Sequence, residues 1–175
     1  MEVRWIDLRQ VASWQLACWE DWLTGEERQR LEAMSGSRRQ TFLCGRGLAR
    51  EMVGEALGIP PETVRFSLNS MGKPETDGIF FSISHSGYLV GCAVDRVPIG
   101  LDVQQTTKVP PRRLSRWMGE GEAFFHHWAR REALAKCRGE SVLQWLHREE
   151  PETGYRWEQL PVPQGYCAWV CRAEE

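Results

Sequence analysis

Asp102 lies in the otherwise apolar stretch Pro98–Gln104, where a carboxylate is unexpected. Successive residues of a strand point to opposite faces, so Asp102 and Gln104 share one face, opposite Leu101 and Val103. A buried carboxylate needs a hydrogen-bonding partner or a metal, and two oxygen donors at this spacing suit a hard cation such as Mg²⁺. A capped or salt-bridged aspartate is the alternative explanation, and this motif alone leaves it open.

A second candidate stretch is Phe80–Gly87, in which an apolar strand ends in Ser84, His85 and Ser86. Polar groups at a strand end are a common setting for a ligand site. A polar hairpin turn produces the same pattern, so both interpretations stay open.

A third stretch, Phe124–Lys136, has the apolar period of a helix. Glu132 and Lys136 are four residues apart and therefore lie on one helical face. An ordinary surface ion pair is the alternative to a functional pair. Upstream, the helix expected over residues 38–57 carries several arginines, which also fit a solvated charged face: Arg38, Arg39, Arg46 and Arg50.

Hydrophobic periodicity and turn residues predict how these stretches are positioned. The order is helices, strands, a helix and strands, which indicates an α+β fold with antiparallel strands. A polar segment that ends in Pro110 and Pro111 favours a division into two lobes nearby. Helices are expected over residues 24–34, 38–57 and 120–137, and strands over 64–68, 79–84, 88–94, 99–103, 155–158 and 165–172.

Composition excludes several classes of protein. The 175 residues are 42% hydrophobic, which predicts a packed core in one domain or two small lobes. A net charge of −2 argues against a general nucleic-acid binder. The N-terminus has no signal-peptide pattern, and no apolar run has the length of a membrane span. Six cysteines without a CxxC pair favour buried reduced thiols, and together these features predict a cytoplasmic protein.

The three stretches and one more form an ordered set of motifs: Met71–Pro74, Phe81–Ser86, Ile99–Asp102 and Trp128–Lys136. This set resembles the Sfp-type 4′-phosphopantetheinyl transferases, whose motifs read approximately GKP, F-N-x-S-H-S, G-I-D-x-E and W-x-x-K-E-A-x-x-K. The resemblance covers roughly residues 24–140.

The resemblance implies a fold of two similar α+β halves, related by a pseudo-twofold axis, with the active site in the cleft between them. Here the halves would be residues 1–103 and 104–175. It implies a monomeric holo-[acyl-carrier-protein] synthase that uses Mg²⁺. The enzyme would transfer the phosphopantetheine arm of coenzyme A to a serine of an acyl or peptidyl carrier protein of fatty-acid, polyketide or nonribosomal peptide synthesis. Adenosine 3′,5′-bisphosphate would be released.

The resemblance also implies roles for individual residues. Asp102 and Glu132 match metal-ligand positions, with Gln104 beside them, and Glu132 is the expected general base. Lys136 would contact the pyrophosphate. The nucleotide part of coenzyme A, chiefly its phosphates, would be held by Lys73, Ser84 and His85, with Arg39 or Arg46 adding a phosphate contact.

Gln104 departs from the family pattern, because many relatives have a second carboxylate at this position. An amide oxygen is a weaker ligand, so the position would bind the metal either directly or through a water. This departure supports one alternative, a non-catalytic relative that binds coenzyme A or a carrier protein. A second alternative, opposed only by the order of the motifs, is another metal-dependent phosphotransfer or hydrolytic enzyme.

Overall fold

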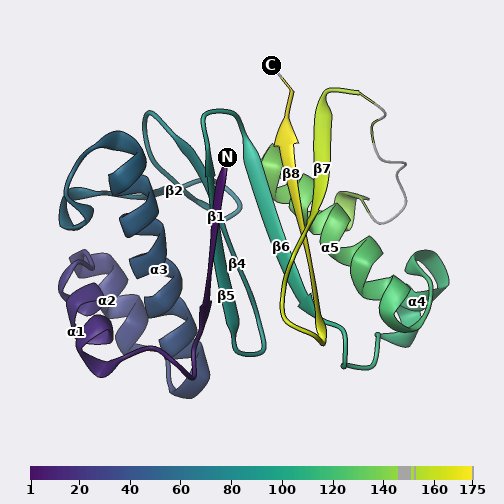
Figure 1. The fold of residues 1–175 in the computed structure, drawn as a ribbon, viewed down its shortest axis with the longest axis horizontal. Coiled ribbons are helices and arrows are strands. Elements are labelled where there is room, and N and C mark those ends of the chain that lie inside the picture. Colours follow the sequence, from purple (N-terminus) through teal and green to yellow (C-terminus); the bar gives the residue numbers. More distant parts are fainter. Residues whose placement is uncertain (146–150, 152, 175) are drawn as a thin grey trace.

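Two three-stranded antiparallel sheets form the centre of the protein, and helices lie on their outer sides (Figure 1). The computed structural model describes residues 1–145, 151 and 153–174. The first half contributes the sheet ordered β1-β5-β4 and the second half the sheet ordered β6-β8-β7. The elements of the first half are β1 (Glu2–Asp7), α1 (Ser13–Asp21), α2 (Gly25–Glu32), α3 (Gly36–Leu57), the 3₁₀ turn η1 (Pro61–Thr63), β2 (Ser67–Leu68), β3 (Pro74–Glu75), β4 (Phe80–Ser86) and β5 (Leu89–Asp95).

The second half repeats the order of strand, helix and hairpin. In each sheet, the first strand pairs with the second strand of the hairpin. The α+β class is thereby confirmed, and the pseudo-twofold relation between the halves stays a prediction. So does the division at residue 103, which falls inside β6. The elements of this half are β6 (Ile99–Gln105), α4 (Arg112–Met118), α5 (Gly121–Arg138), the 3₁₀ turn η2 (Val142–Trp145), β7 (Tyr155–Leu160) and β8 (Tyr166–Ala173).

Apolar layers hold the helices on the sheets. Side chains such as Met52 and Val53 of α3 pack against Phe81 of β4 in one core cluster. Apolar residues of β5, β6 and β8 form a second cluster where the two sheets meet. Fully burying each such side chain contributes about 1.5–3 kcal/mol.

Three serines of β4 join the two sheets. Ser82, Ser84 and Ser86 alternate along the strand and therefore point to one face. Their hydroxyl oxygens accept hydrogen bonds from backbone N–H groups of β6, which satisfies donors of that edge strand. The three N–H groups belong to Leu101 at 3.0 Å, Val103 at 3.1 Å and Gln105 at 3.0 Å.

Most expected elements are present within a few residues of their expected ends. The helix expected from Thr24 begins with a capping box between Thr24 and Glu27. The strand expected over residues 64–68 is wrong in its first part, because only Ser67–Leu68 pairs with another strand. Val64 instead follows η1 and packs in the core under α3, so its apolar character reflects burial. Helix α4 was not expected.

Five of the six cysteines are buried and in no disulfide, as expected, and Cys18 is an exposed thiol. Among the described residues, no helix combines the length and the apolar composition that crossing a membrane requires.

Candidate active site

Strand β6 and helix α5 lie in direct backbone contact at Gly100. A Cβ atom at this position would collide with the carbonyl oxygen of Ala133 and the backbone nitrogen of Cys137. Only glycine allows this approach. As a result, Asp102, two residues along β6, lies beside Lys136 of α5.

Asp102, Glu132 and Lys136 form what we call the carboxylate cluster. The Lys136 Nζ lies 2.8 Å from Asp102 Oδ1 and 3.6 Å from Glu132 Oε1. Asp102 is 2% exposed, so its charge depends on these partners. Ser84 Oγ donates to the same Asp102 oxygen at 2.8 Å, which connects the cluster to β4 of the first half.

The cluster has two carboxylates for one ammonium group. Burial raises the pKa of Glu132; Lys136 opposes this effect, and the negative charge of Asp102 adds to it. Burial alone would lower the pKa of Lys136, but Asp102 and Glu132 outweigh it and raise that pKa. Lys136 therefore stays charged, and with both carboxylates ionised the cluster carries a formal surplus of one negative charge.

Two further side chains orient the carboxylates. The Trp128 indole donates a hydrogen bond to Glu132 Oε2 at 2.6 Å. The Gln104 amide donates to Asp102 Oδ2 at 2.7 Å. Sequence reasoning did not give Trp128 this role, although its separation of four residues from Glu132 on one helix is a usable signal.

The donor chemistry fits Mg²⁺ held jointly with a substrate. Two carboxylates and the neighbouring Gln104 amide supply the oxygen donors that Mg²⁺ prefers, and this ion usually completes its shell with water and phosphate oxygens. Within the described parts of the chain, no group of three or more His, Cys, Asp or Glu residues could hold a metal ion. The three ligands expected from the sequence do come together, and their role as ligands stays a prediction.

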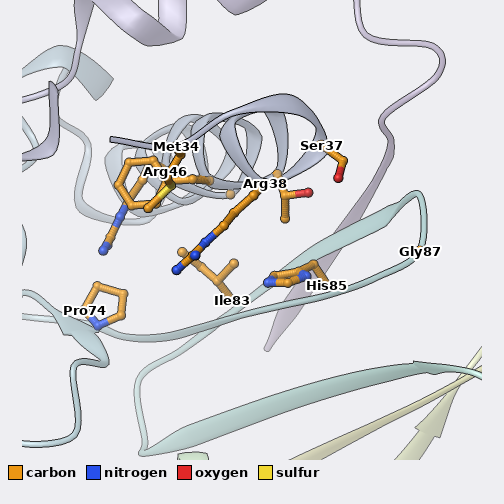
Figure 2. A pocket seen from close by; sticks show the side chains of 11 residues that line it. Met34, Ser37, Arg38, Arg46, Pro74, Ile83, His85 and Gly87 are labelled. Carbon is orange, nitrogen blue, oxygen red and sulfur yellow. The ribbon is translucent and has the colours of Figure 1, made fainter. Parts of the chain in front are cut away.

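A cavity of about 640 Å³ lies between α3 and β4. Figure 2 shows Arg38 extending from α3 toward Ile83 of β4 and Arg46 extending toward Pro74, with His85 on the β4 side of the cavity. A Cβ atom at Gly45 would lie 3.1 Å from the Ile83 side chain, so this glycine brings α3 close to β4. Arginine and histidine on facing walls make the cavity suitable for an anionic ligand.

The cavity lies near the carboxylate cluster, because Pro74 and Ile83 line both this cavity and a smaller neighbouring one that Lys136 lines. Desolvation of the imidazole lowers the pKa of His85, and the charge of Lys136 lowers it further. The two sites therefore share one electrostatic environment.

Three residues expected at the nucleotide have other partners. Ser84 Oγ is buried between Asp102 and the N–H of Val103. The Lys73 ammonium donates to the carbonyl oxygens of Ile99 and Lys136, at 3.1 and 2.8 Å. Arg39 forms an ion pair with Glu20 at 2.7 Å, so of the two expected arginines it is Arg46 that lines the cavity.

Sequence reasoning missed Arg38 and Thr41 as cavity residues. They share a stripe of α3 with Phe42 and Gly45, at the helical spacing i, i+3, i+4 and i+7. That spacing was visible in the sequence, but the face of α3 that borders β4 was not.

Comparison with known proteins gives several relatives of one kind, although no family model matches the chain. The 4′-phosphopantetheinyl transferase HetI of Nostoc is 31% identical over 129 residues, which cover 61% of this chain and 54% of HetI. The 4′-phosphopantetheinyl transferase gsp of Aneurinibacillus migulanus is 28% identical over 131 residues, which cover 63% and 55%. Sfp of Bacillus subtilis, also a 4′-phosphopantetheinyl transferase, is 28% identical over 117 residues, which cover 57% and 52%.

The chain spans about half the length of these curated relatives. All three relatives are 4′-phosphopantetheinyl transferases, the family to which the four motifs point. Over the matched stretch, the chain therefore resembles the Sfp-type 4′-phosphopantetheinyl transferases, as its motifs predict.

Proposed function

We propose that the protein transfers the phosphopantetheine arm of coenzyme A to a serine of an acyl or peptidyl carrier protein, in a Mg²⁺-dependent reaction that releases adenosine 3′,5′-bisphosphate. The observation that carries the proposal is the carboxylate cluster, with its negative surplus, beside a cavity lined by arginines. This pairing suits a phosphorylated substrate that is bound together with a divalent cation. The similarity to named transferases supports the same reaction.

In this proposal, the cavity holds the nucleotide part of coenzyme A. The guanidinium groups of Arg38 and Arg46 face its phosphates, and His85 contributes from β4. Arginine suits this task because its planar donors match pairs of phosphate oxygens. Lys73 and Ser84 stabilise the site indirectly, through hydrogen bonds to backbone groups of β6 and α5.

The reacting groups meet at the carboxylate cluster. The hydroxyl oxygen of the carrier serine forms a bond to the β-phosphorus, while the bond from that phosphorus to the bridging oxygen breaks. Glu132 accepts the serine proton, directly or through a water, and Lys136 supports the charge that develops on the phosphates. Asp102, Glu132 and Gln104 would hold Mg²⁺, which when bound neutralises the pyrophosphate and stabilises the leaving group.

Intact-protein mass spectrometry tests the proposal. Apo carrier proteins of fatty-acid, polyketide and peptide synthesis are incubated with this protein, coenzyme A and Mg²⁺, with and without a chelator. A mass gain of one phosphopantetheine arm, lost with the chelator, is the expected result, and its extent ranks the carriers. Glu122→Gln is the matched control for the variant Glu132→Gln, because Glu122 is exposed on the same helix as Glu132.

The alternative is a relative that binds coenzyme A without transferring it. The Gln104 amide favours it, because it occupies a carboxylate position and contacts Asp102. A folded protein that binds coenzyme A but modifies none of the carriers would establish this alternative.

The proposed enzyme acts as a cytoplasmic monomer. Buried free thiols suit a reducing compartment. Light scattering coupled to size-exclusion chromatography should give the mass of a single chain, and a dimer mass would contradict the monomer.

A further inference from the structure

One buried carboxylate lies between two buried guanidinium groups where α2 packs on α3. We call Glu27, Arg46 and Arg50 the arginine cluster; their exposures are 8%, 7% and 0%. Arg50 Nη2 donates to Glu27 Oε2 at 2.6 Å, and Arg46 Nε lies 3.5 Å from Oε1. Each oxygen of Glu27 thus serves a different arginine.

Glu27 is itself held in place at the start of α2. The backbone N–H of Thr24 donates to Glu27 Oε2 at 3.0 Å, and the Thr24 hydroxyl accepts from the Glu27 N–H. The carboxylate therefore has its position fixed by the helix cap. Because the Glu27 carboxylate is fixed, it restricts the positions of the guanidinium groups of Arg46 and Arg50 that contact it.

The cluster is not neutral, because two cations share one anion. Burial lowers the pKa of Arg46 to about 10, and the neighbouring charges include the repulsive Arg50. Among the described residues, Arg46 Nη1 is buried without a hydrogen-bond partner. A buried donor with surplus charge is costly unless an acceptor reaches it.

Of the three residues of the arginine cluster, only Arg46 presents its positive charge to the cavity. Arg46 lines the cavity, whereas Glu27 and Arg50 do not. The Arg46 guanidinium lies over the rings of Phe42 and Phe66, at 5.3 and 5.6 Å from their centroids. These rings and Glu27 together restrict the orientation of its remaining N–H groups.

We propose that Glu27 is a positioning residue for coenzyme A, which holds the Arg46 guanidinium so that its free edge receives an anionic group of the ligand. The inference rests on the proposed function and goes one step further, since Glu27 does not touch the cavity. Its effect passes through Arg46, so it concerns binding of the ligand and leaves the reacting groups at the carboxylate cluster unchanged.

Glu27→Asp tests this inference, because it keeps the charge and shortens the reach by one methylene. Isothermal titration calorimetry with coenzyme A should give a dissociation constant raised about tenfold, the cost of weakening one charge-assisted contact. In the transfer reaction, KM for coenzyme A should rise by a similar factor while kcat stays within about twofold.

Arg50→Met is the control for stability. It also breaks a contact of Glu27, but leaves Glu27 and Arg46 together, so it should lower the melting temperature without changing the dissociation constant. In the double variant Glu27→Asp, Arg46→Met, the Glu27 change should have no further effect on binding compared with Arg46→Met alone.

Two results would overturn the inference. One is a wild-type dissociation constant for folded Glu27→Asp; the other is a tenfold loss that persists when Arg46 is already absent. Failure of the proposed function gives a different result. If wild-type protein binds no coenzyme A, the proposed function and the role of Glu27 are both wrong. If wild-type protein binds coenzyme A but modifies no carrier, only the transfer reaction is wrong, and the dissociation constants still test the role of Glu27.

Discussion

The arginine cluster of α3 and the carboxylate cluster of α5 use the same three-group arrangement with opposite charge. The first has two guanidinium groups around Glu27, and the second has two carboxylates around Lys136. Each cluster therefore needs one more charge, an anion in the first case and a cation in the second. Coenzyme A phosphates and Mg²⁺ are the proposed partners, so in the proposed function the two halves would bind groups of opposite charge.

In each cluster, the unbalanced charge is shared between a buried residue and an accessible one. Both clusters contain one residue that is almost fully buried, Arg50 or Asp102, and another that reaches the surface or a cavity. The buried member contributes to the stability of the fold. The accessible member leaves its charge available to a ligand.

Glu132→Gln should have the largest effect of the variants considered, because it leaves the carboxylate cluster with one charge of each sign. Transfer should fall about 10²–10⁴-fold, since a general base and a metal ligand are both lost. Kinetics with an apo carrier protein measure the loss, and circular dichroism checks the fold. Near-normal turnover in a folded variant would remove Glu132 from both roles.

Lys136→Met breaks the same cluster from the other side by leaving two carboxylates without a cation. Removing one partner of a buried pair costs about 3–5 kcal/mol, and the lower end applies because a quarter of the Lys136 side chain is exposed. Chemical denaturation without added metal measures the free energy of unfolding. Lys108→Met, at an exposed position, is the control, and equal losses in the two variants would contradict the assigned contacts.

Acid should weaken the arginine cluster by protonating Glu27. Burial acts to raise the pKa of Glu27, but its hydrogen bond from Thr24 and its pairing with Arg50 outweigh this and lower it. A lowered folded-state pKa stabilises the protein above the unfolded pKa of about 4.3, and this stabilisation is lost as the pH falls through the folded value. Glu27→Gln should therefore cost about 2 kcal/mol at neutral pH, and the gap should narrow below about pH 4.3.

Urea denaturation at several pH values measures this gap. Glu32→Gln, at an exposed position late in the same helix, should stay within about 0.5 kcal/mol of wild type throughout. A gap for Glu27→Gln that stays constant down to pH 3 would show that Glu27 does not support the cluster through its charge.

The sequence predicted the carboxylate cluster better than the arginine cluster, for a physical reason. Alternation in β6 and the four-residue spacing in α5 are local rules. They correctly placed Asp102 on one face of a strand and Glu132 and Lys136 together on one face of a helix. Their meeting depends on Gly100, whose importance appears only once β6 and α5 are in contact.

The arginine cluster depends on contacts between distant segments. Arg39 and Arg46 are seven residues apart and share a helical stripe, so spacing could not separate them. Arg39 instead pairs with Glu20 of α1, and Arg46 with Glu27 of α2. Likewise, the motif identified Ser84, but its bond to the β6 backbone required knowing that β4 lies against that edge.

Gln104→Glu should have the smallest effect, because it keeps both carboxylates and Lys136 and adds one negative charge beside the carboxylate cluster. Gln104 lies next to Asp102 and is partly exposed, so a carboxylate there can be solvated and can also bind a metal ion. We expect the Mg²⁺ concentration for half-maximal transfer to fall about threefold to tenfold, with kcat little changed, because a charged oxygen is a stronger ligand for a hard cation. A metal titration of the transfer rate measures this, with Gln105→Glu on the opposite face of β6 as the control. If Gln104→Glu abolishes transfer in a folded protein, its side chain does not belong beside the metal, and Asp102 and Glu132 would have to hold Mg²⁺ with water and substrate alone.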